Sequence, residues 1–267
     1  MFDYHLHSSL SFDSETMPME IALAAKENGL REICFTDHYD YNSDPEKMHN
    51  LFSHDAYRAA YDGLELPGLA IRKGVEAGLT RWNEPQLNAF LQGYLFDFVI
   101  GSVHFVDGYD PYEPEYWQGR TVQEAFRVYL EEIYHCVRIH ENFDVLGHLT
   151  YVCKSVHNPT HAPVQMKDYQ EITDEIMKIL VTKGKGMEIN TSGVDRAGAF
   201  LPSADYLRRF KELGGEIVTL GSDAHDPSRV GQYAPQALTI LEDIFGHVCT
   251  FEKRNPVFHK LSSGYLL

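Results

Sequence analysis

The stretch Asp3-Tyr4-His5-Leu6-His7 opens the chain with two histidines one residue apart. On a β-strand, side chains two residues apart point to the same side, so His5 and His7 can bind one metal ion together. The same arrangement recurs, because short apolar runs end in residue types that bind metals. The recurrences are Ile33–Thr36 before Asp37 and His38, Ile71–Val75 before Glu76, Phe98–Val103 before His104, Val145–Gly147 before His148, and Ile217–Ser222 before Asp223 and His225.

These apolar runs alternate with segments of helical pattern. Gly29 is expected to end the first helix, and Thr121-Val122-Gln123-Glu124 matches a capping box that starts a later one. Repeated strand, helix and strand predict parallel strands joined by right-handed crossovers. We expect strands at 2–6, 31–36, 70–76, 97–103, 144–148, 185–190 and 216–221, an extra strand near 247–251, and helices at 18–28, 121–141, 167–183 and 203–213.

The position of the candidate ligands favours a barrel. They follow the strands, and the active sites of α/β barrels gather at the C-terminal face of the strands. The sequence shows no internal repeat or Pro/Ser-rich linker, so a single α/β domain over 1–267 is the simplest organisation.

Composition narrows the class of protein. A 43% hydrophobic content indicates a globular protein, and a net charge of -16 disfavours nucleic acid as a partner while suiting cation binding. The four cysteines form no C-x-x-C pair, which is typical of reduced thiols in the cytosol. We find no cationic, apolar leader and no apolar run near the roughly 20 residues that span a bilayer, so we expect a cytoplasmic protein that does not bind membranes.

The complete motif set resembles the polymerase-and-histidinol-phosphatase (PHP) superfamily. It comprises H-x-H with a downstream acid, T-D-H, a single Glu, S-V-H, G-H and a closing S-D-A-H, between residues 5 and 225. Within that superfamily the chain is similar to the monofunctional histidinol-phosphate phosphatases, through His5–Ser14, Phe35–His38, Ile100–Asp107 and Phe143–His148. The resemblance implies a distorted (β/α)7 barrel and hydrolysis of L-histidinol phosphate to L-histidinol and phosphate, a step of histidine biosynthesis.

The resemblance also implies three divalent metal ions. Some relatives carry His where this chain has Asp13, which makes the third site richer in oxygen here. Asp13 could instead cap the helix at 18–28, and Asp37 is expected to point away from the metals. Mixed nitrogen and oxygen ligands suit zinc, iron or manganese alike. The implied ligands are His5, His7, Glu76 and Asp223 for the first ion, Glu76, His104 and His148 for the second, with Glu76 bridging, and Asp13, His38 and His225 for the third.

The expected chemistry is attack on phosphorus by a hydroxide that bridges two cations, which lower the pKa of their shared water. The metals neutralise phosphate charge in a loose transition state. Glu76 would support this step by bridging. Asp223 or His225, or a water that they hold, would protonate the leaving alkoxide.

Basic residues near the strand ends are candidates to bind the phosphate. Arg196 is the first candidate, Arg229 the second and Lys154 a third. Lys154 and Thr150 stand where relatives carry an arginine and an acid. Asn190, at the end of the sixth strand, could hydrogen-bond the substrate or be structural. The segments 106–120 and 156–163 are expected to act as lids over a small substrate.

Three other functions use the same residues. One is a protein-tyrosine phosphatase of the same superfamily, or another small-molecule phosphoesterase. A second is a nucleic-acid phosphodiesterase, which the negative charge disfavours. A third is a non-catalytic metal-binding protein, which a missing ligand would indicate, although the set is complete. The sequence does not indicate an oligomeric state.

Overall fold

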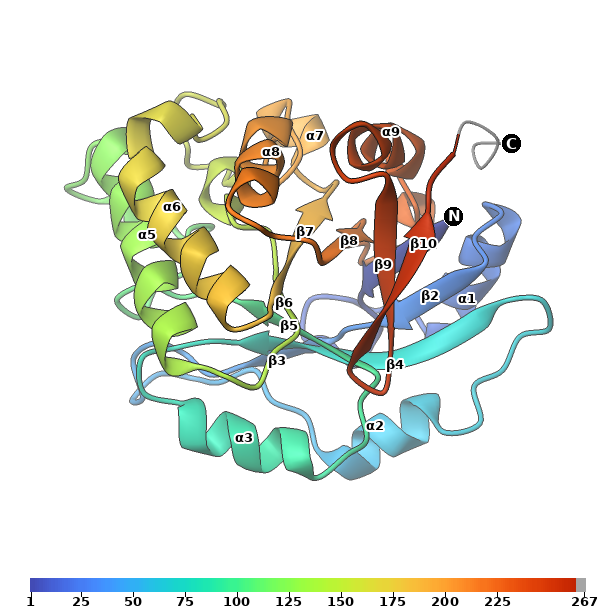
Figure 1. Ribbon diagram of the computed structural model, residues 1–267. Coiled ribbons are helices and arrows are strands. Elements are labelled where there is room, and N and C mark those ends of the chain that lie inside the picture. The colour runs from blue at the N-terminus through green and yellow to red at the C-terminus, as the bar shows by residue number, and fades with distance from the viewer. Residues whose placement is uncertain (263–267) are drawn as a thin grey trace.

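The computed structural model describes residues 1–262, which are built around a parallel sheet. Its strands lie in the order β1 (Phe2–Leu6), β2 (Glu32–Phe35), β4 (Ala70–Gly78), β5 (Phe98–Ser102), β6 (Val145–Leu146), β7 (Gly186–Asn190) and β8 (Val218–Gly221). The first and last strands of this order meet. Leu6 and Ala224 form a parallel bridge, and the backbone N–H of Asp223 donates to the carbonyl of His5 at 2.8 Å. The helices lie outside the sheet (Figure 1). The predicted distorted seven-stranded α/β barrel is therefore confirmed.

The secondary structure follows the predicted alternation. The α-helices at 54–61, 84–92, 114–117, 194–197 and 234–244 and the strands at 38–40 and 255–260 were not individually predicted. The strands are β1 Phe2–Leu6, β2 Glu32–Phe35, β3 His38–Asp40, β4 Ala70–Gly78, β5 Phe98–Ser102, β6 Val145–Leu146, β7 Gly186–Asn190, β8 Val218–Gly221, β9 His247–Glu252 and β10 Asn255–Lys260. The α-helices are α1 Pro18–Glu27, α2 His54–Tyr61, α3 Glu84–Gln92, α4 Pro114–Trp117, α5 Val122–Ile139, α6 Met166–Thr182, α7 Val194–Ala197, α8 Ala204–Glu212 and α9 Ala234–Ile244, with 3₁₀ turns η1 Tyr151–Lys154 and η2 Pro227–Arg229.

Local sequence signals explain where two of the helices begin and end. The Thr121 hydroxyl accepts the Glu124 N–H at 3.2 Å, and the Glu124 carboxylate accepts the Thr121 N–H at 2.8 Å, so the predicted capping box is present. Helix α1 stops before Gly29, whose φ of 72° lies in the left-handed region that glycine adopts without strain. These ends fix the lengths of the crossovers between strands.

The second strand of the barrel is interrupted, and the interruption matters for the site. Strand β2 pairs with the first half of β4, and β3 pairs with its second half. The register places His38 directly beside Glu76. The break between β2 and β3 therefore carries a histidine into the barrel mouth, next to the carboxylate on the neighbouring strand.

The β9–β10 hairpin closes the opposite end of the barrel. The Phe251 ring lies 4.8 Å from the Phe98 ring, and the Tyr4 hydroxyl donates to the Phe251 carbonyl at 3.2 Å. At the hairpin turn, the Arg254 N–H donates to the Asp97 carbonyl at 2.8 Å. Because Tyr4, Asp97 and Phe98 lie at or near strand starts, the hairpin seals the N-terminal face and leaves the C-terminal face for ligands. The extra strand expected near 247–251 is confirmed as β9.

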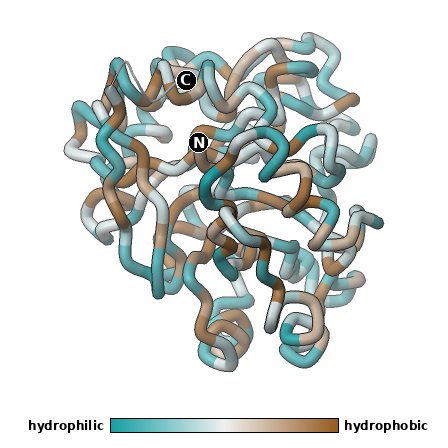
Figure 2. The backbone as a smooth tube through the Cα atoms, turned by 90° about the vertical axis from the view of Figure 1, so that its right-hand side faces the viewer, coloured by the Kyte–Doolittle hydropathy of each residue, from teal (hydrophilic) through white to brown (hydrophobic). Residues whose placement is uncertain are grey.

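Apolar residues fill the space between sheet and helices. Figure 2 shows polar and apolar residues alternating along much of the chain, as amphipathic outer elements require. All four cysteines are buried and form no disulfide. Within residues 1–262, no helix combines the length and apolar character that crossing a membrane requires.

Candidate metal centre

All the predicted ligand residues meet in one cluster at the C-terminal face of the barrel. Most of their side chains are buried, whereas Asp13 and His225 keep 37% and 27% of their side-chain surface exposed toward the cavity above. The cluster consists of His5, His7, Asp13, His38, Glu76, His104, His148, Asp223 and His225.

Glu76 lies at the centre of this cluster. Its Oε1 is 2.8 Å from Nε2 of His148 and 3.2 Å from Nε2 of His104. Its Oε2 is 3.1 Å from Nε2 of His5 and 3.0 Å from Nδ1 of His38. Burial alone would raise the pKa of this carboxyl, but the surrounding histidines outweigh burial and hold the pKa well below its usual range. Glu76 is therefore an ionised carboxylate whose two oxygens face different ligand groups, as a bridging ligand requires.

His7 connects the remaining ligands. Its Nε2 is 3.3 Å from Oδ1 of Asp223, and its ring contacts those of His38 and His225, with centroid distances of 4.2 and 4.0 Å. Asp13 Oδ2 lies 3.2 Å from Nε2 of His225 and 3.6 Å from Nε2 of His38. These contacts bring Asp13, His38 and His225 together, and the ligand atoms of His7, His38 and His225 lie within 4.8 Å of one another.

The donor atoms fit divalent cations. Buried nitrogen and oxygen atoms of six of the ligands have no hydrogen-bond partner in the described chain, and buried polar atoms are normally satisfied. Cations would satisfy those atoms that face the cluster, whereas His148 presents its other ring nitrogen, Nε2, to Glu76. The unpartnered atoms are Nε2 of His5, His7 and His225, Nδ1 of His38 and His148 and Oε2 of Glu76, and sets of three ligand atoms within 4.8 Å occur in His5/Glu76/His148, His5/His7/Asp223, His7/His38/His225 and His38/Asp40/His104.

Asp40 is a buried carboxylate of the site that the sequence analysis did not identify. Its Oδ1 lies 2.9 Å from Nδ1 of His104, and its Oδ2 lies 3.3 Å from Nδ1 of His38. A carboxylate that accepts from one ring nitrogen fixes which other nitrogen can bind a metal. The sequence signal was its position, since Asp40 is two residues after His38 on the same strand and so shares its face.

Glu188, on β7, is a second buried carboxylate that contacts a ring nitrogen of a ligand histidine. Its Oε1 lies 2.7 Å from Nδ1 of His5, and its Oε2 accepts the backbone N–H of His148 at 2.9 Å. The side chain is fully buried. An acidic residue inside an otherwise buried strand was the signal that could have identified it.

Two earlier alternatives are resolved by local contacts. Asp37 accepts the N–H of Ser8 at 2.7 Å and the hydroxyl of Ser11 at 2.8 Å, so it faces away from the ligand atoms as expected. Helix α1 has Met17 as its N-cap, and Asp13 therefore does not cap it.

Lys154 is buried beside the centre and is already paired. Its Nζ donates to Oδ2 of Asp223 at 2.6 Å and to the Ser192 hydroxyl at 2.9 Å. Burial would raise the pKa of Asp223, but Lys154 together with His5, His7 and His225 outweighs burial and holds the pKa of this carboxyl well below its usual range. Asn190 does not line the cavity; its amide accepts the Ser192 N–H at 2.9 Å and donates to Glu188 at 3.2 Å. Its geometry favours an orienting role over substrate contact.

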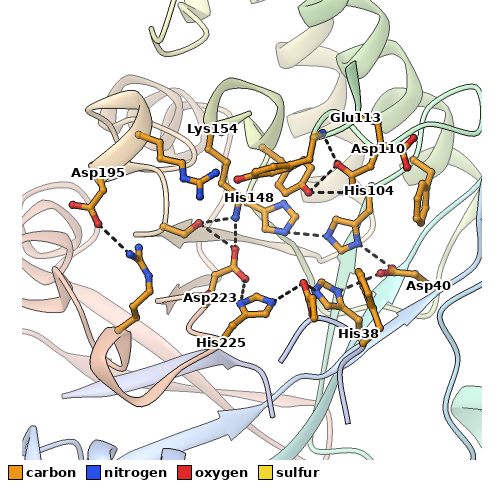
Figure 3. A pocket seen from close by; sticks show the side chains of 18 residues that line it. His38, Asp40, His104, Asp110, Glu113, His148, Lys154, Asp195, Asp223 and His225 are labelled. Carbon is orange, nitrogen blue, oxygen red and sulfur yellow. Dashed lines mark hydrogen bonds and ion pairs between the residues drawn. The ribbon is translucent and has the colours of Figure 1, made fainter. Parts of the chain in front are cut away.

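A cavity of about 520 Å³ lies over the cluster (Figure 3). Arg196 and Arg229, the first and second candidates to bind the phosphate, both line it. The Arg196 guanidinium lies 5.5 Å from the centre of the Tyr112 ring, so the loop after β5 and the turn after β7 meet at the cavity. Arg229 Nη1 is 3.2 Å from Oδ2 of Asp195. The segment 106–120 thus borders the cavity, as expected.

The prediction that 156–163 also covers the substrate is wrong. This segment contributes no lining residue. Asn158 donates to the carbonyls of Cys153 and Ala162 and accepts from Thr160, so the segment is folded onto itself beside η1.

Comparison with known proteins gives a consistent result. The family model described as PHP domain matches residues 3–192. The histidinol-phosphatase of Lactococcus lactis is 33% identical over 255 residues, which are 93% of each chain. The "probable histidinol-phosphatase" of Clostridium acetobutylicum is 31% identical over 256 residues, 95% of this chain and 98% of that one. The crystal structure of the L. lactis histidinol phosphate phosphatase, complexed with zinc, L-histidinol and phosphate, has a TM-score of 0.79 and 29% identity, covering 96% of this chain and 98% of that one.

Proposed function

The chain belongs to the PHP domain family, and we propose that it is a metal-dependent phosphatase that hydrolyses L-histidinol phosphate to L-histidinol and phosphate. The observation that carries this function is the complete ligand cluster around Glu76, placed under a small cavity at the open end of the barrel. The relatives named for this activity match nearly the whole chain, including the strands after residue 192.

The centre binds divalent metal, and we further propose three ions. His5, His7, Glu76 and Asp223 would hold the first, Glu76, His104 and His148 the second, and Asp13, His38 and His225 the third. Zinc, iron or manganese would suit these ligands. Bound cations of this kind make water more acidic and neutralise the charge of a phosphate.

The chain's own side chains would position the reactants. Lys154 and Ser192 hold Oδ2 of Asp223, which turns Oδ1 toward His5 and His7. Asp223 or His225, directly or through a water molecule, would deliver a proton to the leaving alkoxide.

Arg196 would bind the phosphate, with Arg229 as the second candidate. Arg196 lines the cavity, and no carboxylate in residues 1–262 forms an ion pair with it, whereas Arg229 is paired with Asp195. The charge of -16 supports a small phosphomonoester over nucleic acid as the substrate. We also expect the enzyme to work in the cytoplasm.

The test is phosphate release from L-histidinol phosphate, a phosphotyrosine peptide and a dinucleotide, with defined metals. We expect the highest kcat/KM for L-histidinol phosphate. Strong chelation should abolish activity, and added Zn²⁺ or Mn²⁺ should restore it. Full activity of an enzyme verified to be metal-free would contradict metal dependence, and a higher kcat/KM for the peptide or the dinucleotide would contradict the substrate.

A further inference from the structure

The lysine and arginine residues that line the cavity over the metal centre are all on one side of it. Lys154, Arg196 and Arg229 lie on the side formed by the segments after β6, β7 and β8. Asp223 and Asp195 pair with Lys154 and Arg229 there, so Arg196 is the cation on this side that has no carboxylate partner within residues 1–262. Asp110 and Glu113, in the loop after β5, lie on the other side, beyond His104 (Figure 3). A ligand that fits both sides has a negative group toward the cations and a positive group toward the acids.

Asp110 is held in place but has no cationic partner. Its Oδ1 accepts the Tyr112 N–H at 2.8 Å and the Tyr151 hydroxyl at 3.1 Å. The next residue, Pro111, accepts the Trp117 indole N–H at 2.8 Å, which fixes the loop. No Lys, Arg or His of residues 1–262 forms an ion pair with Asp110. Burial raises the pKa of its carboxyl, and such a group gains most from a bound cation.

We propose that Asp110 binds the ammonium group of the substrate and so selects phosphomonoesters that carry an amino group close to the phosphate. This inference rests on the proposed function. The Tyr151 side chain connects Asp110 with the metal centre. Its hydroxyl contacts Asp110, and its ring lies 4.9 Å from the His148 ring and 5.4 Å from the His104 ring.

The substrate's geometry agrees with this position. In L-histidinol phosphate, the amino group sits on the carbon next to the CH₂–O–P group. A phosphate at the metal centre therefore keeps the ammonium on a short tether inside the same cavity, which Asp110 lines. Glu113 is on the same side but is exposed, so water screens its charge and its contribution is smaller.

The test compares Asp110→Asn with the wild type on two substrates: L-histidinol phosphate and imidazolylpropyl phosphate, which differs only by lacking the amino group. Asparagine keeps an oxygen that can accept from Tyr112 and Tyr151. We expect kcat/KM for L-histidinol phosphate to fall by about tenfold to a hundredfold, the loss of one charge-assisted contact, and kcat/KM for the analogue to stay within about twofold.

The matched control is Asp107→Asn. Asp107 lies in the same loop, is exposed, pairs with Arg120 at 2.7 Å and does not line the cavity. We expect it to leave both substrates unaffected. Metal content and hydrolysis of the analogue show whether each variant is folded. Equal effects of Asp110→Asn on both substrates, or no effect, would overturn the inference. A wild type that does not hydrolyse L-histidinol phosphate would overturn the proposed function instead.

Discussion

Replacing Glu188 by glutamine should weaken the metal centre although Glu188 itself is not a proposed ligand. The side chain is fully buried, and its two oxygens contact Nδ1 of His5 at 2.7 Å and the backbone N–H of His148 at 2.9 Å. Glutamine has nearly the same shape but only one acceptor oxygen. The amide oxygen must face His148, because a backbone N–H cannot be reversed and Asn190 also donates to this position.

The amide NH₂ group would then face Nδ1 of His5. That ring nitrogen can accept only if its proton moves to Nε2, the atom that lies 3.1 Å from Glu76 in the ligand cluster. A protonated Nε2 cannot bind a metal. Loss of a partner of this kind costs 10- to 100-fold in metal affinity, or about 1.4–2.7 kcal/mol, and the tautomer change places Glu188→Gln near the upper limit.

The assay is competitive metal titration of the metal-free protein against a chelator of known affinity, together with kcat/KM for L-histidinol phosphate. Glu32→Gln is the matched control, because Glu32 contacts Tyr4 and Arg72 at the sealed end of the barrel. We expect normal metal affinity in the control. Metal affinity of Glu188→Gln within threefold of the wild type, with the same metal content, would refute the tautomer argument.

Three further substitutions test other contacts. Glu76→Gln should remove at least one bound ion, measured by elemental analysis, because a bridging carboxylate contributes to two sites, whereas His135→Gln, away from the cluster, should retain all of them. Arg196→Ala should raise KM for L-histidinol phosphate by roughly tenfold or more through loss of a charge-assisted phosphate contact, and unchanged kinetics would exclude this role. Gly78→Ala should lower kcat/KM, because the added Cβ would lie against the Asp40 carboxylate; a crystal structure with an undisplaced Asp40 would contradict the reasoning.

The sequence predicted the barrel and the ligand cluster because both depend on local pattern. Each ligand except Asp13, which the family resemblance supplied, lies in or directly after an apolar run, and the barrel topology then brings these runs together. His5 and His7 show this most clearly, since their spacing alone places them on one face. The sequence also indicated that Glu76 lies among the histidines. It did not indicate which histidines face Oε1 and which face Oε2.

The contacts of Asp40 and Glu188 with the ligand histidines could not be predicted from local sequence pattern. Asp40 and Glu188 act on His104 and His5 across the barrel, and those pairings depend on strand register and on the break between β2 and β3. The wrong expectation for 156–163 has a similar origin. Loop composition indicates a turn-rich segment but not its direction, and here the Asn158 contacts turn it back on itself.

The contact between β1 and β8, which closes the barrel, also determines when the metal centre can be completed during synthesis of the chain. His5 and His7 are translated before Asp223 and His225, which emerge only after strands β1 to β8 have been made. Because the proposed first metal position lies between β1 and the segment after β8, a nascent chain that ends before β8 offers only part of its donor set. Metal loading at this position therefore follows the synthesis of β8, whereas Glu76, His104 and His148 of the proposed second position are made earlier.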